Sequence, residues 1–160
     1  MKKIFVSTLI ALLLLIVLAS TTFAAPAGER QLLLKGSLQA TETHVVTPPT
    51  MFVDANGSGQ ATQLGAFTMS FQTQVYLPTL FAASESAILV AADGSSLFGE
   101  GSGQGTLTET LGVISIVETY AITGGTGRFA GATGNFTVER LLDRVTLISS
   151  GAVSGKIVLP

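Results

Sequence analysis

Apolar and polar side chains alternate with a period of two residues along much of this chain. Between Arg30 and His44, the apolar residues Leu32, Leu34, Leu38 and Ala40 occupy even positions, and every odd position from 35 to 43 is polar. Such alternation predicts a β-strand with one buried face. After residue 26 no segment has a convincing 3.6-residue period, so the chain is predicted to be all-β.

Turn signals divide the remaining sequence into short runs. We expect a break at Thr47–Thr50 and tight turns at Asn56–Gly57, Asp93–Gly94 and Asp143–Arg144. Residues 79–86 are predicted to form a loop, and Gly65 a bulge within a strand. The first strand begins near Gln31, and the others are expected at 51–55, 60–76, 86–92, 96–106, 113–123, 135–142 and 146–159. About eight regularly spaced strands favour a sandwich or a barrel.

The N-terminus has the three parts of a secretory signal peptide. Lys2 and Lys3 precede an apolar run, and Thr22-Phe23-Ala24 places small residues at the −3 and −1 positions of a cleavage site. We expect export to the periplasm, the cell envelope or the medium, with cleavage after Ala24. Residues 1–24 would be the signal peptide and residues 25–160 a single domain, with no membrane span left after cleavage. The alternative is that the apolar run stays as an uncleaved anchor.

The composition limits the classes of molecule that the protein is expected to bind. Without Lys2 and Lys3, six basic residues face ten acidic ones and no basic patch is visible, which argues against nucleic acid as a partner. There is no cysteine, so a hydrophobic core must stabilise the fold without disulfides. Only 11% of residues are charged, although 47% are hydrophobic. This imbalance suggests faces that are buried by oligomerisation, or an apolar cavity.

The most distinctive stretch is "GGTGRFAGATG", Gly124 to Gly134. Part of it fits the dinucleotide fingerprint G-x-G-x-x-G/A, but no helix of useful length follows and too few residues remain for a dinucleotide fold. We therefore expect no cofactor. The glycines instead suit a connection between antiparallel strands, with an apolar plug. The residues of this structural motif are Gly124, Gly125, Gly127, Phe129, Gly131 and Gly134.

The segment "ITGGTGRFAGATGNFT" resembles the glycine-rich segment of the allene oxide cyclase and dirigent-like barrel superfamily, in particular its small exported bacterial members. Ser58–Thr68 and Ala91–Thr106 also look like segments of those proteins. The resemblance implies an eight-stranded antiparallel barrel, a lumen that holds a small apolar molecule in plant members, and assembly into trimers. Most bacterial members have no known activity, so the resemblance implies the fold more firmly than the function.

The alternation of residues along each strand predicts which polar side chains face the interior and could line a pocket. If the more apolar face of each strand points inward, Glu42 and His44 share the interior with the leucines of the first strand, Glu118 and Tyr120 with neighbouring isoleucines, and Arg140 with Phe136. A buried charge needs a partner, so we expect a Glu118–Arg140 pair. The glycine connection should bring Glu118 and Tyr120 nearer to Arg140 than Ile114.

The alternative is that these polar side chains lie at wet strand ends and form no pocket. No metal site is expected, because His44 is the only histidine and cysteine is absent. The glycines at 99, 101, 103 and 105 share one face. They would either thin a wall beside a ligand or let the strand coil.

Three classes of function remain open. The chain could be a barrel that binds a small apolar ligand in its lumen, which we favour. It could be an isomerase-like or cyclase-like protein, or a stereochemical guide, although we lean against an enzyme. It could also be a structural or envelope-associated protein with a filled barrel. The lumen distinguishes these classes, because both ligand hypotheses fail if side chains fill it.

Overall fold

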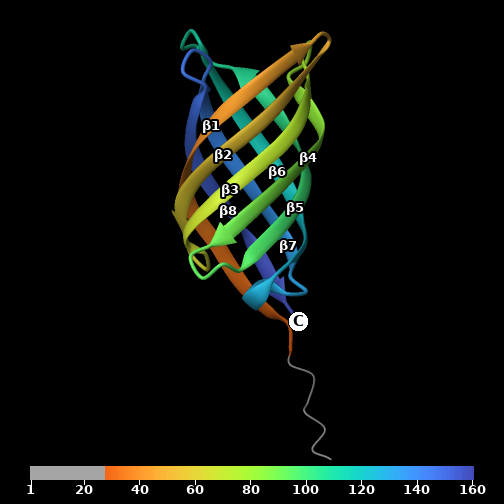
Figure 1. Cartoon of the computed structure of the whole chain (residues 1–160), viewed down its shortest axis with the longest axis vertical. Coiled ribbons are helices and arrows are strands. Elements are labelled where there is room, and N and C mark those ends of the chain that lie inside the picture. The colour runs from red at the N-terminus through yellow and green to blue at the C-terminus, as the bar shows by residue number, and fades with distance from the viewer. Residues whose placement is uncertain (1–27) are drawn as a thin grey trace, which may run out of the picture.

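The computed structural model describes residues 28–160, so the predicted signal peptide lies outside the described residues. Eight strands follow one another along the chain (Figure 1). They are β1 (Arg30–Thr47), β2 (Thr50–Ala61), β3 (Gly65–Tyr76), β4 (Phe81–Ala91), β5 (Ser96–Leu107), β6 (Val113–Gly125), β7 (Thr133–Asp143) and β8 (Ile148–Leu159), with one 3₁₀ turn, η1 (Gly127–Phe129), between β6 and β7. The all-β prediction is confirmed.

The strands close into one antiparallel barrel in sequence order. Each strand pairs with the next, and β1 completes the ring by pairing with β8, Leu34 lying opposite Gly155. Closure leaves no free sheet edge and turns alternate residues of every strand toward the axis. The predicted eight-stranded barrel is therefore confirmed, and so is the inward face of the first strand, where Leu34, Leu38 and Ala40 are buried.

One turn prediction was wrong, and one turn was missed. Asn56 and Gly57 lie inside β2 rather than in a turn. A Cβ on Gly57 would lie 2.2 Å from the Gln39 carbonyl oxygen, so this glycine permits close approach of β1. The turn comes after Ala61, where Gln63 adopts a positive φ of 68°. It contains neither proline nor glycine, which explains why the sequence suggested one strand from 60 to 76 with a bulge at Gly65.

The predicted loop at 79–86 is also wrong over most of its length. Strand β4 begins at Phe81, and only Leu77–Leu80 forms the connection, with Leu80 at a positive φ of 53°. The pairing of β4 with both neighbours is irregular near Ala82 and Glu85. This local bulge interrupts the alternation that would have marked the strand in the sequence.

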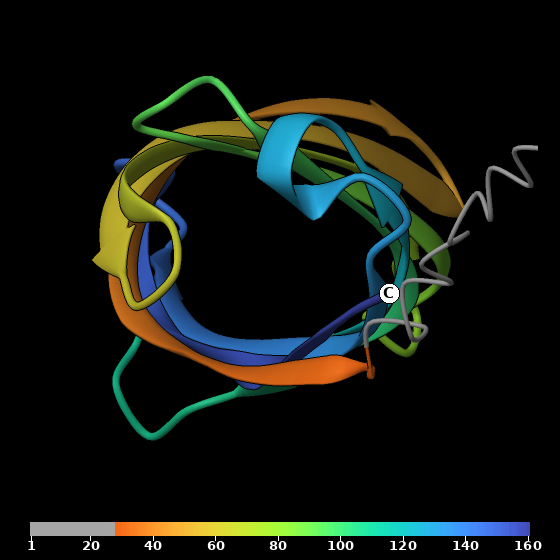
Figure 2. The same cartoon turned by 90° about the horizontal axis from the view of Figure 1, so that it is seen from below.

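The glycine-rich segment closes one end of the barrel. The 3₁₀ turn η1 lies at the rim of this end and projects over one side of the opening when the barrel is viewed from below (Figure 2). Phe129 is 1% exposed, which confirms it as an apolar plug. Glycines 124, 127, 131 and 134 adopt positive φ as expected, whereas Gly125 does not. At Gly125 a Cβ would approach the Ser96 carbonyl oxygen to 2.4 Å, so packing requires the glycine there.

The core fills the half of the barrel near this closed end. Tyr120 stacks between Phe71 and Phe136, with ring centroids 5.8 and 4.8 Å apart. Below this stack lie buried apolar side chains from every strand, among them Leu34, Phe67, Leu97 and Ile157. The four hairpin connections β1–β2, β3–β4, β5–β6 and β7–β8 all lie at the opposite end, which we call the open end (Figure 1). No helix in residues 28–160 has the length and apolar character needed to cross a bilayer.

Candidate functional site

A buried arginine lies at the centre of a polar cluster inside the barrel. Arg140, on β7, donates from Nε to Glu118 Oε2 at 2.9 Å and from Nη2 to Glu118 Oε1 at 2.6 Å. This two-point contact fits the planar guanidinium and is among the stronger forms of ion pair. Both residues are at least 96% buried, which confirms the predicted Glu118–Arg140 pair and its inward orientation.

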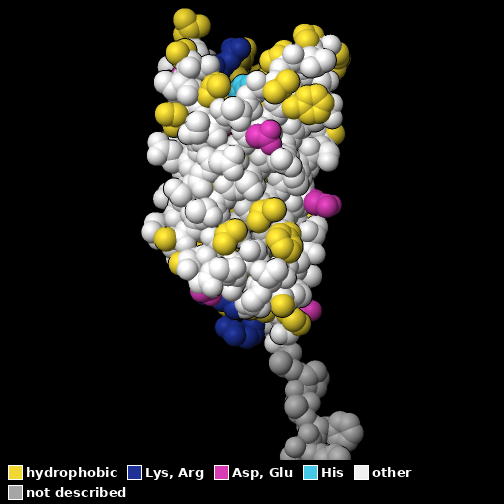
Figure 3. Space-filling view, viewed as in Figure 1, with side chains coloured by type: hydrophobic (Ala, Val, Ile, Leu, Met, Phe, Trp, Pro, Cys, Tyr) yellow, Lys and Arg dark blue, Asp and Glu magenta, His cyan; other side chains and the backbone are white. Residues whose placement is uncertain are grey.

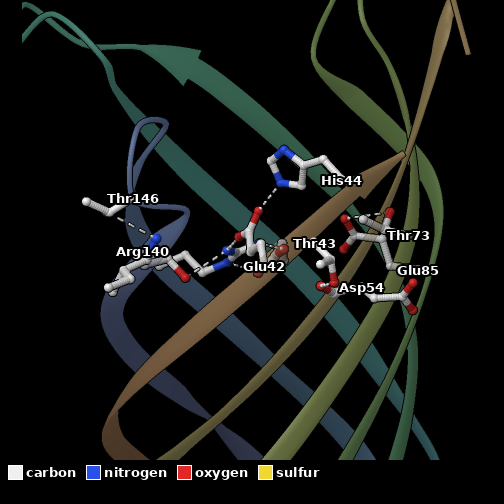
Figure 4. Close-up of polar contacts among 11 residues, drawn as sticks. Glu42, Thr43, His44, Asp54, Thr73, Glu85, Arg140 and Thr146 are labelled. Atoms are coloured by element: carbon white, nitrogen blue, oxygen red, sulfur yellow. Dashed lines mark hydrogen bonds and ion pairs between the residues drawn. The ribbon is translucent and has the colours of Figure 1, made fainter. Parts of the chain in front are cut away.

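A second carboxylate binds the same arginine from the other side of β8. Glu42, on β1, accepts a hydrogen bond from Arg140 Nη1, which also donates to Ser149 Oγ at 3.0 Å. The other Glu42 oxygen lies 2.7 Å from Nε2 of His44, closer to the open end (Figure 4). The consecutive strands β6, β7 and β8 thus meet β1, which is far from them in the sequence, in one connected network.

The network compensates the burial of its charges. Burial alone would lower the pKa of Arg140, but the hydrogen bonds and negative charges of Glu118 and Glu42 outweigh that effect and raise the pKa above its ordinary value. The Phe71 ring centroid lies 5.9 Å from the guanidinium carbon and adds a cation–π contact. Arg140 is therefore charged throughout the physiological pH range.

Glu85, on β4, lies beside this network without an ion pair, and the sequence did not reveal it. Its Oε1 accepts a hydrogen bond from Thr73 Oγ1 at 3.2 Å, while its Oε2 is buried with no partner among the described residues (Figure 4). Burial and the nearby charge of Glu118 raise the pKa of Glu85 to about 7, against the smaller opposing effects of Tyr120, Thr73 and Arg140. The alternation of Ala87, Leu89 and Ala91, continued backwards by two residues, would have placed Glu85 on the inner face.

Tyr120 is fully buried beneath these groups. Its hydroxyl neighbours Glu85 but has no hydrogen bond of ordinary geometry among the described residues. Burial, then the charges of Glu118 and Glu85, raise the pKa of the phenol above its ordinary value, so the hydroxyl stays neutral. Tyr120 and Glu85 Oε2 are the two buried side-chain polar groups left unpartnered in residues 28–160. Such groups mark a site where a ligand or water can bind.

The strand register corrects one expectation about Tyr120. Arg140 lies directly opposite Ile116, so Glu118 and Ile114 are equally close to it along β6, and Tyr120 is farther away. Tyr120 pairs with Phe136 instead and belongs to the aromatic stack. Its contribution to the site is the hydroxyl beside Glu85 rather than a contact with the guanidinium.

A pocket lies above the polar cluster. It has a volume of about 60 Å³, and Glu42, Glu85, Glu118 and Arg140 contribute to its lining. Its other walls are mainly apolar and include Met51, Val53, Leu80, Ala82, Ile114 and Leu142. This space is enough for a few small groups of atoms. The lumen is thus filled near the closed end and hollow toward the open end, which keeps both ligand hypotheses tenable.

The glycines of β5 shape one wall of this pocket. Gly103 and Gly105 line it, and a Cβ on Gly103 would lie only 2.6 Å from Glu85 Oε1. Gly101, by contrast, approaches backbone, where a Cβ would lie 2.1 Å from the Thr119 carbonyl oxygen. The glycine run therefore thins a wall beside the polar cluster, as one of the two interpretations expected, and it also lets β6 pack closely. Coiling of the strand stays a prediction.

All five residues nominated from the sequence point into the barrel. Glu42, Glu118, Tyr120 and Arg140 are buried, which excludes the alternative of wet strand ends for them. His44 lies nearer the opening, with 17% of its side chain exposed. Glu85, Thr73 and Ser149 complete the cluster and were missed. No group of three His, Cys, Asp or Glu side chains within residues 28–160 could hold a metal ion.

Exposed apolar side chains surround the open end, and we call them the apolar collar (Figure 3). They come from strand ends and loops on every side of the opening: Val45, Val46, Phe52, Tyr76, Phe81, Leu107, Leu111 and Val145. Leu111 is 100% exposed and Val145 is 86% exposed. An exposed apolar surface of this kind is typical of an interaction site, and here it lies where a molecule would enter the pocket.

No protein-family model and no curated protein matches the sequence. Solved structures do match the fold. The pterocarpan synthase dirigent protein GePTS1 has a TM-score of 0.59 and 14% identity over 81% of this chain and 90% of that chain. The pterocarpan synthase dirigent protein PsPTS1 has a TM-score of 0.55 and 14% identity over 80% of this chain and 94% of that chain. The resemblance drawn from the glycine-rich segment is therefore confirmed at the level of the fold: this chain has the same eight-stranded β-barrel fold as these dirigent proteins.

Proposed function

We propose that this protein binds a small, mostly apolar molecule with a polar end in the pocket at the open end of the barrel. One observation carries the proposal: an otherwise apolar pocket has a floor of buried charged groups, one of which, Glu85, has an unpartnered oxygen. A filled structural barrel has no need for such a floor, because burying charges costs free energy that apolar packing would avoid. The apolar collar around the opening supports the entry of an apolar molecule.

A second candidate function is guidance of a reaction in the same pocket, as in an isomerase or cyclase. It is favoured by Glu85, whose pKa of about 7 lets it give or accept a proton near neutral pH. The dirigent barrels with the same fold include two described as pterocarpan synthases. Binding is the less demanding function and is required by both candidates.

Calorimetric titration of the purified protein with hexan-1-ol tests the proposal. We expect saturable binding that Ala82→Leu weakens about tenfold or more, because the added methyl groups fill the pocket. The matched control is Ala83→Leu, on the exposed face of the same strand, which should leave binding within about twofold of the wild type. Equal affinity in the wild type and Ala82→Leu, or no binding at all, would contradict the proposal.

We further propose that the protein acts after export, on the evidence of the basic, apolar and small-residue segments in residues 1–24. N-terminal sequencing of protein recovered outside the cytoplasm should begin at Ala25. Recovery of intact Met1 from a membrane fraction would favour the uncleaved anchor. Trimer assembly, which the family resemblance implies, can be measured on the same material by light scattering.

A further inference from the structure

The buried charged groups that line the pocket include more acidic side chains than basic ones. Glu42, Glu85 and Glu118 line the pocket together with one guanidinium, that of Arg140. Arg140 directs Nε and Nη2 to Glu118 and Nη1 to Glu42 and Ser149. The arginine is therefore committed to two carboxylates, and the third has no cation beside it.

Glu85 is the carboxylate that lacks a cation. It is 95% buried, and its Oε2 has no partner among the described residues. The groups facing it from neighbouring strands offer no unshared positive charge. They are Thr73 on β3, Gly103 on β5, Glu118 and Tyr120 on β6, and Arg140 on β7. His44, on the inner face of β1 toward the open end, is bound to Glu42.

We infer that the ligand's polar end is a cation, and that the pocket selects small alkyl ammonium compounds. This inference rests on the proposed binding function and specifies its ligand class. An ammonium group has three donors and no acceptor. Glu85 Oε2, which has no partner in residues 28–160 and belongs to a residue that lines the pocket, can accept a hydrogen bond from it. A carboxylate ligand would instead meet three acidic side chains in a water-poor site, where repulsion is strong.

The protonation of Glu85 supplies a measurable signature. Burial and Glu118 raise its pKa to about 7, so a bound ammonium must compete with a proton for this carboxylate. Binding should therefore release a proton and become tighter as pH rises through 7. A group with that pKa changes from mostly protonated at pH 6 to mostly ionised at pH 8, which predicts about tenfold tighter binding across the interval. The ammonium itself stays charged, because alkylamines titrate near the lysine value of about 10.4.

Three probes of equal chain length test the inference: hexylamine, hexan-1-ol and hexanoate, each titrated calorimetrically into the full protein at pH 6 and pH 8. We expect hexylamine to bind most tightly and hexanoate most weakly. Glu85→Gln should weaken hexylamine binding at pH 8 about tenfold and remove its pH dependence, while hexan-1-ol changes by about twofold or less. The matched control is Glu100→Gln, an exposed carboxylate on the outer face of β5.

The outcomes separate the inference from the proposed function. If hexan-1-ol binds and hexylamine binds no more tightly than hexan-1-ol, the cation preference is overturned and the proposed binding function remains. Tight hexylamine binding that changes neither with pH nor in Glu85→Gln would show that Glu85 is not the group that binds the ammonium. Failure of all three probes to bind would overturn both the inference and the binding function.

Discussion

Arg140 and Glu118 hold each other across a diagonal of the β6–β7 pair, not as direct register partners. Arg140 lies opposite Ile116 and Glu118 opposite Val138, yet two hydrogen bonds of 2.9 and 2.6 Å join the side chains. The diagonal leaves Nη1 free to reach Glu42 on β1, beyond the intervening strand β8. One guanidinium thereby compensates two buried carboxylates, one on the adjacent strand β6 and one on β1, two strands away on its other side.

Replacing Arg140 with methionine should destabilise the protein strongly. The substitution retains apolar volume but leaves Glu42 and Glu118 buried without their cation, and losing one partner of a buried ion pair costs about 3–5 kcal/mol. The free energy of unfolding in urea at pH 7 measures the effect. Arg144→Met, at an exposed arginine of the β7–β8 turn, is the control and should change stability by about 0.5 kcal/mol or less. A loss below about 1 kcal/mol in Arg140→Met would mean that water reaches the network.

Glu85→Gln should make stability less sensitive to pH. The folded-state pKa of Glu85 is about 7, raised from 4.5, so folding favours the protonated acid. Its stabilising effect is complete below pH 4.5 and is lost as pH rises to about 7. The linked difference is about 3 kcal/mol. Glutamine resembles the protonated acid, so the variant should match the wild type at pH 4 and be more stable at pH 8.

Urea unfolding of both proteins across pH 4–8 measures this difference directly. Since other groups titrate equally in the two proteins, only the difference between their curves reports on Glu85. Glu139→Gln changes an exposed carboxylate of β7, so its curve of unfolding free energy against pH should run parallel to that of the wild type. Parallel curves for Glu85→Gln would show that Glu85 does not change its pKa on folding.

Alternation predicted the all-β class and most of the polar cluster, whereas the choice of a barrel over a sandwich came from the resemblance of the glycine-rich segment. Residues two apart on a strand share a face, so apolar neighbours were enough to place Glu42, Glu118 and Arg140 inside. Once the face was known, the cost of an unpaired buried charge predicted the Glu118–Arg140 pair. That step needed no knowledge of register, which explains its success although the register around Arg140 differs from the expectation.

The features that could not be predicted from the sequence depend on irregular backbone and on contacts between strands that only the closed barrel brings together. Glu85 was missed because a bulge near Ala82 breaks the alternation of β4 and made the segment resemble a loop. The β2–β3 turn was missed because its residues 62–64 include no glycine, and Gly65, which follows them at a positive φ of 66°, suggested a bulge inside one long strand. The contact between Glu42 and Arg140 joins residues 98 positions apart and requires the closed barrel. Local patterns carry no information about such a contact.

Phe129→Ala should destabilise the closed end without emptying the pocket. The side chain is 1% exposed and is covered by the glycine-rich connection, so its removal leaves a cavity at a cost of about 3–5 kcal/mol. Urea unfolding gives the loss, and Leu111→Ala, at a fully exposed leucine of the β5–β6 loop, is the control. Hexan-1-ol affinity should remain within about twofold at temperatures where the variant is folded. A large loss of affinity would mean that the two ends of the barrel are coupled.

Gly103→Ala should destabilise the protein because the new methyl group displaces the side chain of Glu85. A double-mutant cycle can test this cause. The new Cβ would lie 2.6 Å from Glu85 Oε1 and 3.0 Å from Glu118 Cγ, so Glu85 must shift away from Thr73, at a cost of about 1–3 kcal/mol. Adding Glu85→Ala removes the obstructing carboxylate and should recover about 1 kcal/mol or more relative to the sum of the single changes. Gly101→Ala is the matched comparison, because its Cβ would meet the Thr119 backbone at 2.1 Å, and Glu85→Ala should not rescue it. Additive effects of Gly103→Ala and Glu85→Ala in urea unfolding would show that this glycine is required by the strand and not by the carboxylate at the pocket floor.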